Sequence, residues 1–213
     1  MPCGQCAGIE QEFNEAVARR ELARYRRRGP GGTTRLLIDA LKQAGVGGQT
    51  LLDIGGGVGV IQHELVSDGL DRVTSVDASP AYLDAQRTEA ARRGYAGRAA
   101  YLAGDFVALA PQVPPADLVT LDRVICCYHE MSALVGASAS RAHRLYGIVI
   151  PRDAWWNALG IRLVNFVLRL RRSPFRTFLH APAAIEAVIH DQGLRRREFL
   201  RETLVWRVAV YAR

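Results

Sequence analysis

The stretch from Thr50 to Gly59 constrains the fold of this chain more than any other. It reads TLLDIGGGVG, so an apolar run typical of a buried parallel strand leads directly into glycines. Apolar residues then recur at helical spacing, at Val60, Ile61, Leu65 and Val66. The glycines therefore lie in a strand-to-helix turn. Glycine permits positive φ and close approach of a ligand there, and the helix offers unpaired N–H groups.

The spacing of the glycines excludes two common nucleotide-binding motifs. A dinucleotide fingerprint would need glycine at Val60 or Gln62, and the chain contains no G-x-x-x-x-G-K-[ST] run. The pattern present is D-x-G-x-G-x-G, which begins at Asp53. A carboxylate at the end of the strand would repel a pyrophosphate but suits a cationic ligand.

This pattern resembles the first motif of the class I methyltransferases that depend on S-adenosylmethionine (SAM). The resemblance covers about residues 45–213 and is closest to the small-molecule type, with a more distant similarity to the magnesium-protoporphyrin O-methyltransferase group. It implies a Rossmann-like, doubly wound α/β fold, with a seven-stranded sheet that is mostly parallel, an antiparallel C-terminal strand, and helices on both faces. It also implies SAM as cofactor and S-adenosylhomocysteine (SAH) as product. The ammonium and sulfonium charges of SAM would suit Asp53.

A second predicted strand ends at Asp77, 22 residues after Gly55. An acidic side chain at this point can accept hydrogen bonds from both ribose hydroxyls, and the resemblance assigns it that role. The alternative is a helix N-cap, because Ser79 precedes Pro80, a favoured first helical residue. Both can hold if Ser79 caps the helix while Asp77 binds.

Asp105 and Phe106 follow the third predicted strand and resemble the third motif of the family, whose acidic side chain meets the adenine amino group. The alternative is an ordinary turn aspartate. The resemblance thus implies a cofactor site formed by Asp53, Gly55, Gly56, Gly57, Gly59, Asp77, Ala78, Ser79, Asp105, Phe106, Leu121 and Asp122.

No metal site is predicted, because the Cys3 and Cys6 pair has no second pair at ligand spacing.

The fourth predicted strand ends near Asp122, and ligands of open α/β sheets bind beyond such strand ends. Contact with the methyl acceptor is therefore expected from residues at and after this strand end: Asp122, Arg123, Cys126, Tyr128 and His129. Candidates for a catalytic base are His129, Tyr128 and His180. The alternative for His129 is a cap or surface residue. Cys126 and Cys127 lack a preceding proline and are interpreted as small apolar fillers.

The N-terminal part, residues 1–44, is predicted to form a helical cap on a SAM-binding domain at 45–213. Residues 9–28 suggest one amphipathic helix with Ile9, Phe13, Ala16 and Val17 on its apolar face. The resemblance implies that this helix covers the cofactor pocket. The alternative is a solvated basic helix end, favoured by the helix dipole.

An apolar and basic helical insertion is predicted at about residues 151–182. Trp155, Leu159, Leu163, Phe166 and Leu170 recur at helical spacing, with arginines elsewhere around the helix. Three hypotheses remain open: a substrate lid, a membrane-surface helix over 155–172, and core packing or a dimer face. Further on, we expect a helix at 182–192 and two closing strands, with Arg195, Arg196 and Arg197 in a turn region between helix and strands.

The net charge of +7 would suit an anionic substrate, an anionic membrane surface or a nucleic acid. The four cysteines and the acidic residues near the start, which argue against a secretory signal, predict a reducing cytoplasm. No apolar run reaches the length of a membrane span.

The predicted reaction is a single in-line displacement that moves the methyl group of SAM to a small apolar or anionic metabolite, with much of the catalysis arising from proximity. The alternatives are an RNA- or DNA-directed methyltransferase, a methyltransferase for a membrane lipid or quinone, and a SAM-binding protein without activity.

Overall fold

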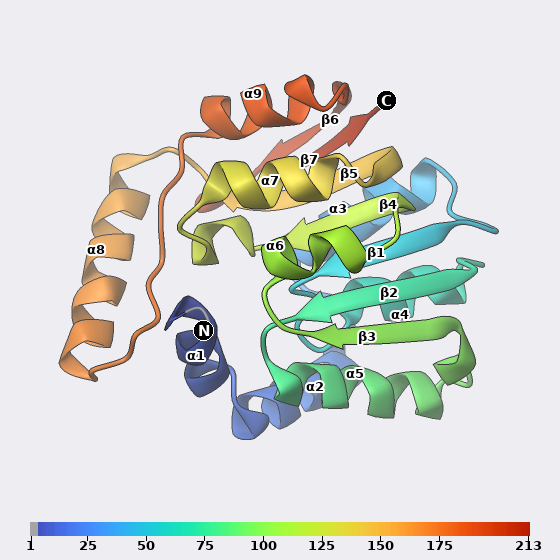
Figure 1. Cartoon of the computed structure of the whole chain (residues 1–213), viewed down its shortest axis with the longest axis horizontal. Coiled ribbons are helices and arrows are strands. Elements are labelled where there is room, and N and C mark those ends of the chain that lie inside the picture. The colour runs from blue at the N-terminus through green and yellow to red at the C-terminus, as the bar shows by residue number, and fades with distance from the viewer. Residues whose placement is uncertain (1–3) are drawn as a thin grey trace.

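The computed structural model describes residues 4–213, apart from the side chains of residues 4–7 and 196–198. A single sheet crosses the molecule, in the order β3-β2-β1-β4-β5-β7-β6 (Figure 1). Its strands are β1 (Thr50–Ile54), β2 (Arg72–Asp77), β3 (Ala99–Ala103), β4 (Ala116–Asp122), β5 (Ala142–Pro151), β6 (Arg195–Glu202) and β7 (Trp206–Ala212). Strands β1 to β5 are parallel where they pair, and β7 runs antiparallel between β5 and β6. The predicted seven-stranded, mostly parallel sheet is confirmed.

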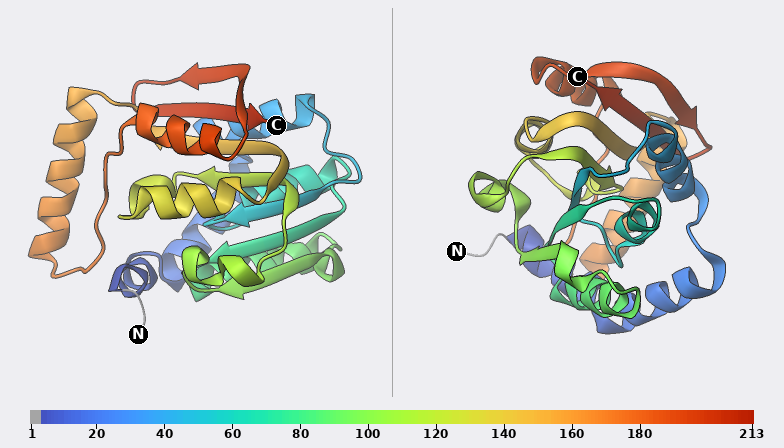
Figure 2. Two further views of the ribbon diagram at one scale, coloured as in Figure 1. Left: turned by 45° about the horizontal axis from the view of Figure 1, so that its top comes forward. Right: turned by 90° about the vertical axis from the view of Figure 1, so that its right-hand side faces the viewer.

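Helices cover both faces of the sheet (Figure 2). On one face, α3 (Gly32–Gln43) and α4 (Val60–Ser67) share a buried cluster with Leu51 of β1. On the other, α7 (Met131–Ala139) and α9 (Pro182–Asp191) share a cluster with Leu52. Successive residues of a strand point to opposite faces, so the apolar run of β1 serves both layers. The shorter elements are α6 (Phe106–Leu109), η1 (Ala96–Arg98), η2 (Ala110–Gln112) and η3 (Ile125–Cys127).

The two closing strands form an antiparallel hairpin, in which β7 pairs with β5 and β6 lies at the edge of the sheet. The turn region predicted for the arginine run was wrong. The arginine run that begins at Arg195 lies in β6 rather than in a turn, and Arg195 pairs with Ala212. Pairing with β7 satisfies the backbone of this stretch in spite of its weak strand composition.

The sequence of residues 130–144 suits one helix, but helix α7 stops before the end of this range. It ends at Ala139, and β5 already begins at Ala142, which pairs with Ala116 of β4. Parallel pairing in the centre of the sheet therefore overrides the helical pattern of the sequence.

The single N-terminal helix predicted over 9–28 was also wrong, because the chain forms α1 (Gly4–Glu12) and α2 (Glu15–Arg28). Asn14 begins α2, and its side-chain oxygen accepts hydrogen bonds from the N–H groups of Ala16 and Val17. The buried face of α2 carries Ala18, Leu22 and Tyr25, whereas Ala16 is exposed. This face packs against α5 (Pro80–Arg92) through Tyr82.

Helix α8 (Trp155–Leu170) lies at one end of the molecule. After a turn at residues 171–172, residues 173–181 return beside it without regular secondary structure (Figure 1). The two are joined through Asn165, whose side chain donates to the carbonyl oxygen of Thr177 at 2.8 Å and accepts from its N–H at 2.9 Å. Within residues 4–213, no helix has the length and hydrophobicity needed to cross a bilayer.

Candidate active site

A cavity of about 940 Å³ lies at the carboxyl ends of β1, β2 and β4 and is lined from above by α1 and α2. This is where open α/β sheets bind their ligands. Of the predicted cofactor residues, the following line the cavity: Gly55, Gly56, Gly57, Asp77, Ala78, Asp105, Phe106 and Asp122. Asp53, Gly59, Ser79 and Leu121 do not.

The glycine turn forms one wall of the cavity. Gly57 has a φ of 57°, and a Cβ added to it would meet nothing within 4 Å, so its backbone faces open space. A Cβ added to Gly56 would collide with the carboxylate of Asp53. The turn is therefore closely packed on the side of Asp53 and open on the side of the cavity, which suits close approach of a ligand to the backbone.

Asp53 lies beneath this turn rather than in the cavity wall. Its side chain is fully buried, and Oδ1 accepts a hydrogen bond from the hydroxyl of Thr120 at 2.8 Å. Its Oδ2 has no hydrogen-bond partner among the described residues. Burial, reinforced by the charge of Asp122, raises the pKa of Asp53 to about 7. Asp53 therefore does not line the cavity itself, and its carboxylate lies against the backbone of Gly56.

Asp77 lies at the end of β2 with its carboxylate at the cavity. Oδ1 accepts from the N–H of Ser79 at 2.8 Å, and Oδ2 accepts from the N–H of Gly57 at 3.3 Å. Burial raises the pKa of Asp77 to about 6, against the lowering effect of these backbone donors. Ser79 is the N-cap of α5, because its hydroxyl oxygen accepts from the N–H of Tyr82.

Asp105 and Phe106 occupy the turn after β3. The Asp105 carboxylate caps α6 by accepting from the N–H of Val107 at 3.0 Å. The hydroxyl of Tyr128 donates to the same carboxylate at 3.0 Å. Phe106 is buried and contributes an apolar surface beside this acidic group.

Asp122 is the centre of a polar cluster at the end of β4. Thr34 donates its hydroxyl to Oδ2 at 2.5 Å, and Arg123 donates Nε to Oδ1 at 3.0 Å. Arg123 has a φ of 62°, and its guanidinium lies 5.9 Å from the ring centre of Trp206. Leu121, by contrast, points into the hydrophobic core.

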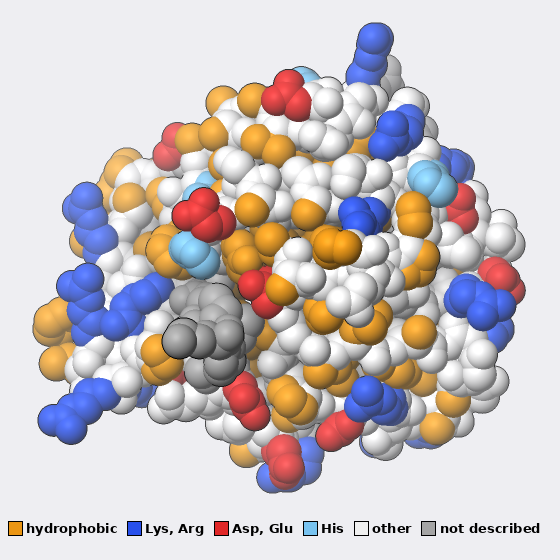
Figure 3. Space-filling model, viewed as in Figure 1, with side chains coloured by type: hydrophobic (Ala, Val, Ile, Leu, Met, Phe, Trp, Pro, Cys, Tyr) orange, Lys and Arg blue, Asp and Glu red, His pale blue; other side chains and the backbone are white. Residues whose placement is uncertain are grey.

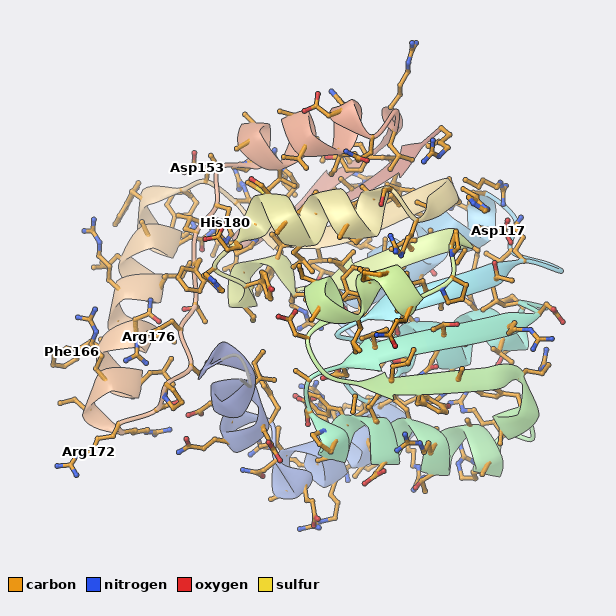
Figure 4. The ribbon with its side chains drawn as sticks, viewed as in Figure 1. Asp117, Asp153, Phe166, Arg172, Arg176 and His180 are labelled. Carbon is orange, nitrogen blue, oxygen red and sulfur yellow. The ribbon has the colours of Figure 1, made fainter. Side chains whose placement is uncertain are left out.

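The three predicted candidates for a base are not equally placed. Tyr128 lines the cavity. His129 is exposed outside it and stacks on the Tyr128 ring, with ring centres 5.3 Å apart. His180, which Figure 4 labels, hydrogen-bonds through Nε2 with the backbone oxygen of Tyr128 at 2.9 Å. It is not among the residues that line the cavity. Within the described chain, no histidine lines the cavity.

Several lining residues were not found from the sequence. The largest group lies on one face of α2, at Glu21, Arg24, Tyr25 and Arg28. Their spacing of three, four and seven residues is a helical stripe that could have indicated them. Thr33, Thr34, Phe175, Thr177, Thr203 and Trp206 come from distant segments. Cys127, interpreted as a filler, also lines the cavity. Cys126 lines it too, as the expected contact with the methyl acceptor requires.

Comparison with known proteins identifies the matched part of this chain. Residues 52–150, from β1 through β5, match the methyltransferase domain family. This matched part is a methyltransferase domain of the class that uses SAM. The match includes the glycine turn, Asp77, Asp105 and Asp122. These cavity residues therefore belong to the methyltransferase domain, whose cofactor is SAM.

Solved structures share the fold of this methyltransferase along nearly its whole length. The magnesium protoporphyrin IX methyltransferase ChlM from Synechocystis PCC 6803, solved with bound SAH, is similar with a TM-score of 0.72 and 19% identity. The similarity covers 98% of this chain and 99% of that one. An O-methyltransferase family protein from Burkholderia thailandensis has a TM-score of 0.71 at 18% identity, over 96% of this chain and 62% of that one. No match is found among curated protein sequences.

The cavity of the methyltransferase fits the cofactor that its family uses. The backbone of Gly57 is open to the cavity, and the buried carboxylate of Asp77 is held at its edge by backbone donors. A carboxylate beside an open glycine turn can accept hydrogen bonds from the hydroxyls and the amino group of an adenosyl ligand.

Proposed function

We propose that this methyltransferase transfers the methyl group of SAM to a small, largely apolar acceptor that carries a carboxylate. The observation that supports it most is the pair Arg24 and Arg28, which line the cavity from α2. Neither makes an ion pair with a carboxylate of the described residues. Arginine binds carboxylates in a bidentate geometry, so this pair could fix the charged end of the acceptor.

The rest of the wall supports an apolar body for the acceptor. Hydrophobic and aromatic side chains contribute to the cavity wall, at Ile9, Phe13, Val58, Tyr82, Phe175 and Trp206. Small-molecule sites commonly combine such walls with a few well-placed polar groups. An acceptor with an apolar skeleton and one acidic group matches this distribution.

For the cofactor, we assign Asp77 to the ribose hydroxyls, Asp105 and Phe106 to the adenine, and the backbone of residues 55–57 to the amino-acid end. When bound, SAM supplies a methyl group on a positively charged sulfur, which an acceptor oxygen can displace in line. The contribution of the protein is to align the two reactants and to exclude water.

A carboxylate acceptor also agrees with the lack of a histidine along the described part of the cavity wall. A carboxylic acid is already ionised near neutral pH, so its oxygen needs no base to remove a proton. Tyr128 is then a positioning residue, because its hydroxyl donates to Asp105. We do not assign a role in proton transfer to His129 or His180.

The test is methyl transfer from methyl-labelled SAM to fractions of a small-molecule extract. A methyl ester releases labelled methanol in mild base, whereas methyl ethers and N-methyl groups keep their label. We expect base-labile label in an apolar, acidic fraction. Base-stable label would contradict a carboxylate acceptor, and label in RNA would favour the nucleic-acid alternative.

A further inference from the structure

The outer face of α8 is apolar, which is the reverse of an ordinary surface helix. Five of its large hydrophobic side chains are between 57% and 74% exposed: Trp155, Leu159, Leu163, Phe166 and Leu170. The inward face carries the buried residues Asn157 and Leu168. Figure 4 shows Phe166 pointing away from the sheet. The hydrophobic stripe therefore faces away from the body of the protein.

A second segment continues this apolar surface. In the turn between β6 and β7, Leu204 is 72% exposed and Val205 is also exposed. Trp156 joins helix and turn, because its Nε1 donates to the carbonyl oxygen of Leu204 at 3.0 Å. Asn157 adds a second link by donating to the carbonyl oxygen of Val205 at 2.9 Å. We call α8 together with Leu204 and Val205 the outer apolar surface.

The charged side chains of α8 and of the two residues after it are all positive. Residues 155–172 contain four arginines and no acidic residue: Arg162, Arg169, Arg171 and Arg172. All four are exposed. Figure 3 shows arginine side chains along the edge of the molecule where α8 lies, with hydrophobic side chains between them. An exposed apolar stripe bordered by arginines is complementary to an anionic lipid surface.

We propose that the outer apolar surface docks this methyltransferase on the surface of an anionic lipid bilayer. Helix α8 lies in the plane of the interface, with its leucines and phenylalanine among the acyl chains and its arginines at the headgroups. Tryptophan favours the same interface, and Trp155 and Trp156 begin the helix. At 16 residues, the helix lies on the membrane and does not span it.

A second copy of the chain fits this surface less well than a bilayer does. A twofold dimer brings the same patch of each copy together. It would place the arginines of both α8 helices at one interface without an acidic residue of either helix to pair with them. A lipid surface supplies the missing negative charge.

Docking would place lipid beside the catalytic cavity. The segment that returns from α8 lines the cavity at Phe175 and Thr177. Phe175 packs edge-on against Phe13 of the N-terminal segment, with ring centres 5.5 Å apart. The docking proposal does not depend on the identity of the acceptor, and its test does not use methyl transfer.

The experiment is co-sedimentation of the full chain with vesicles of phosphatidylcholine alone and of phosphatidylcholine mixed with phosphatidylglycerol. We expect binding to the anionic vesicles, weakened by salt. Leu163→Glu combined with Phe166→Glu should weaken binding at least about 10-fold, because it places two charges on the apolar face that would enter the bilayer. Ala184→Glu with Ala187→Glu is the matched control, since both alanines are exposed on α9 at the same spacing.

The arginines are tested in a second pair of variants. Arg162→Gln with Arg169→Gln should weaken binding to anionic vesicles by about 10-fold or more. Arg20→Gln with Arg27→Gln removes the same charge from exposed positions of α2 and should leave binding close to that of the wild type. Circular dichroism verifies that each variant is folded.

Two results would overturn the proposal. One is absence of binding to anionic vesicles. If light scattering then showed a dimer that Leu163→Glu dissociates, the outer apolar surface would be assigned to contact with a second copy. The other is binding that both α8 variants leave unchanged, which would place lipid contact elsewhere on the protein.

Discussion

The carboxylate of Asp77 accepts a hydrogen bond from the backbone N–H of Gly57 at 3.3 Å. This contact joins the end of β2 to the glycine turn that follows β1, two strands that lie side by side in the sheet. The second oxygen of Asp77 is held by the N–H of Ser79 at 2.8 Å. The carboxylate is thus fixed at the cavity before any ligand arrives, a form of preorganisation that lowers the cost of binding.

Asp77→Asn should weaken the binding of SAH by about 10- to 100-fold, because hydrogen bonds to a charged group exceed those to an amide. The measurement is isothermal calorimetry. Asp71→Asn, at an exposed position just before β2, is the control and should bind as the wild type does. Equal affinities for Asp77→Asn and the wild type would remove Asp77 from the site.

Arg24→Gln with Arg28→Gln should raise the KM for a carboxylate acceptor by about 10-fold or more, because each charge-assisted contact contributes on the order of 1.5 kcal/mol. The dissociation constant for SAH should change little. Arg20→Gln with Arg27→Gln removes two charges from the same helix outside the cavity. If both double variants behaved alike, the effect would come from net charge rather than from contact.

Asp53 should make the free energy of unfolding fall as the pH rises. Its pKa is about 7 in the folded protein against an ordinary value of 3.8, so the folded state binds a proton that the unfolded state has released. Stability from this group is complete below pH 3.8 and is lost as the pH rises to about 7. Asp53→Asn removes this dependence. The stability of the variant minus that of the wild type, from urea unfolding, should increase with pH across this window. A constant difference would refute the buried position of the carboxylate.

Glu89 should be a strong stabiliser of the joint between α2 and α5. Its buried carboxylate accepts from Arg26 at 2.9 Å, Arg92 at 2.5 Å and Arg93 at 2.8 Å. The guanidinium of Arg92, followed by those of Arg93 and Arg26, lowers the pKa of Glu89 below its ordinary value of 4.5 against the effect of burial. Its contribution is therefore present above pH 4.5 and lost as the pH falls.

Glu89→Gln should destabilise the protein by about 3 kcal/mol, because three arginines lose their shared partner. Urea unfolding at neutral pH measures this change. Glu130→Gln changes an exposed carboxylate and is the control. A loss no larger than that of Glu130→Gln would show that the cluster contributes little.

The parts of the fold that the sequence predicts well are those determined by local patterns. The apolar run at Thr50–Ile54 can only be a buried strand before its glycines, and Ser79 before Pro80 starts a helix as expected. The turn, Asp77 and Asp105 could be predicted because the motif residues are close to strand ends. Their neighbourhood in space then follows from the parallel sheet.

The rest of the site depends on contacts between distant segments, which no local pattern determines. Thr34 reaches Asp122 across 88 positions, and Tyr82 donates to Glu21 of α2 across 61. Strand β6 forms from an arginine-rich stretch because β7 offers it a partner. His129 has a suitable side chain for a base, but its backbone position directs it to solvent. Two local patterns do predict further features: Asn14 is a good N-cap residue for α2, and the residues of α2 that line the cavity recur at helical spacing.

The most direct test of this account is calorimetric titration of the wild-type protein with SAH, with NAD as the comparison ligand. We expect one SAH bound for each chain and no heat from NAD, because the glycine turn lacks the dinucleotide spacing and Asp77 and Asp105 line the cavity. Failure to bind SAH, or binding of NAD in its place, would contradict it.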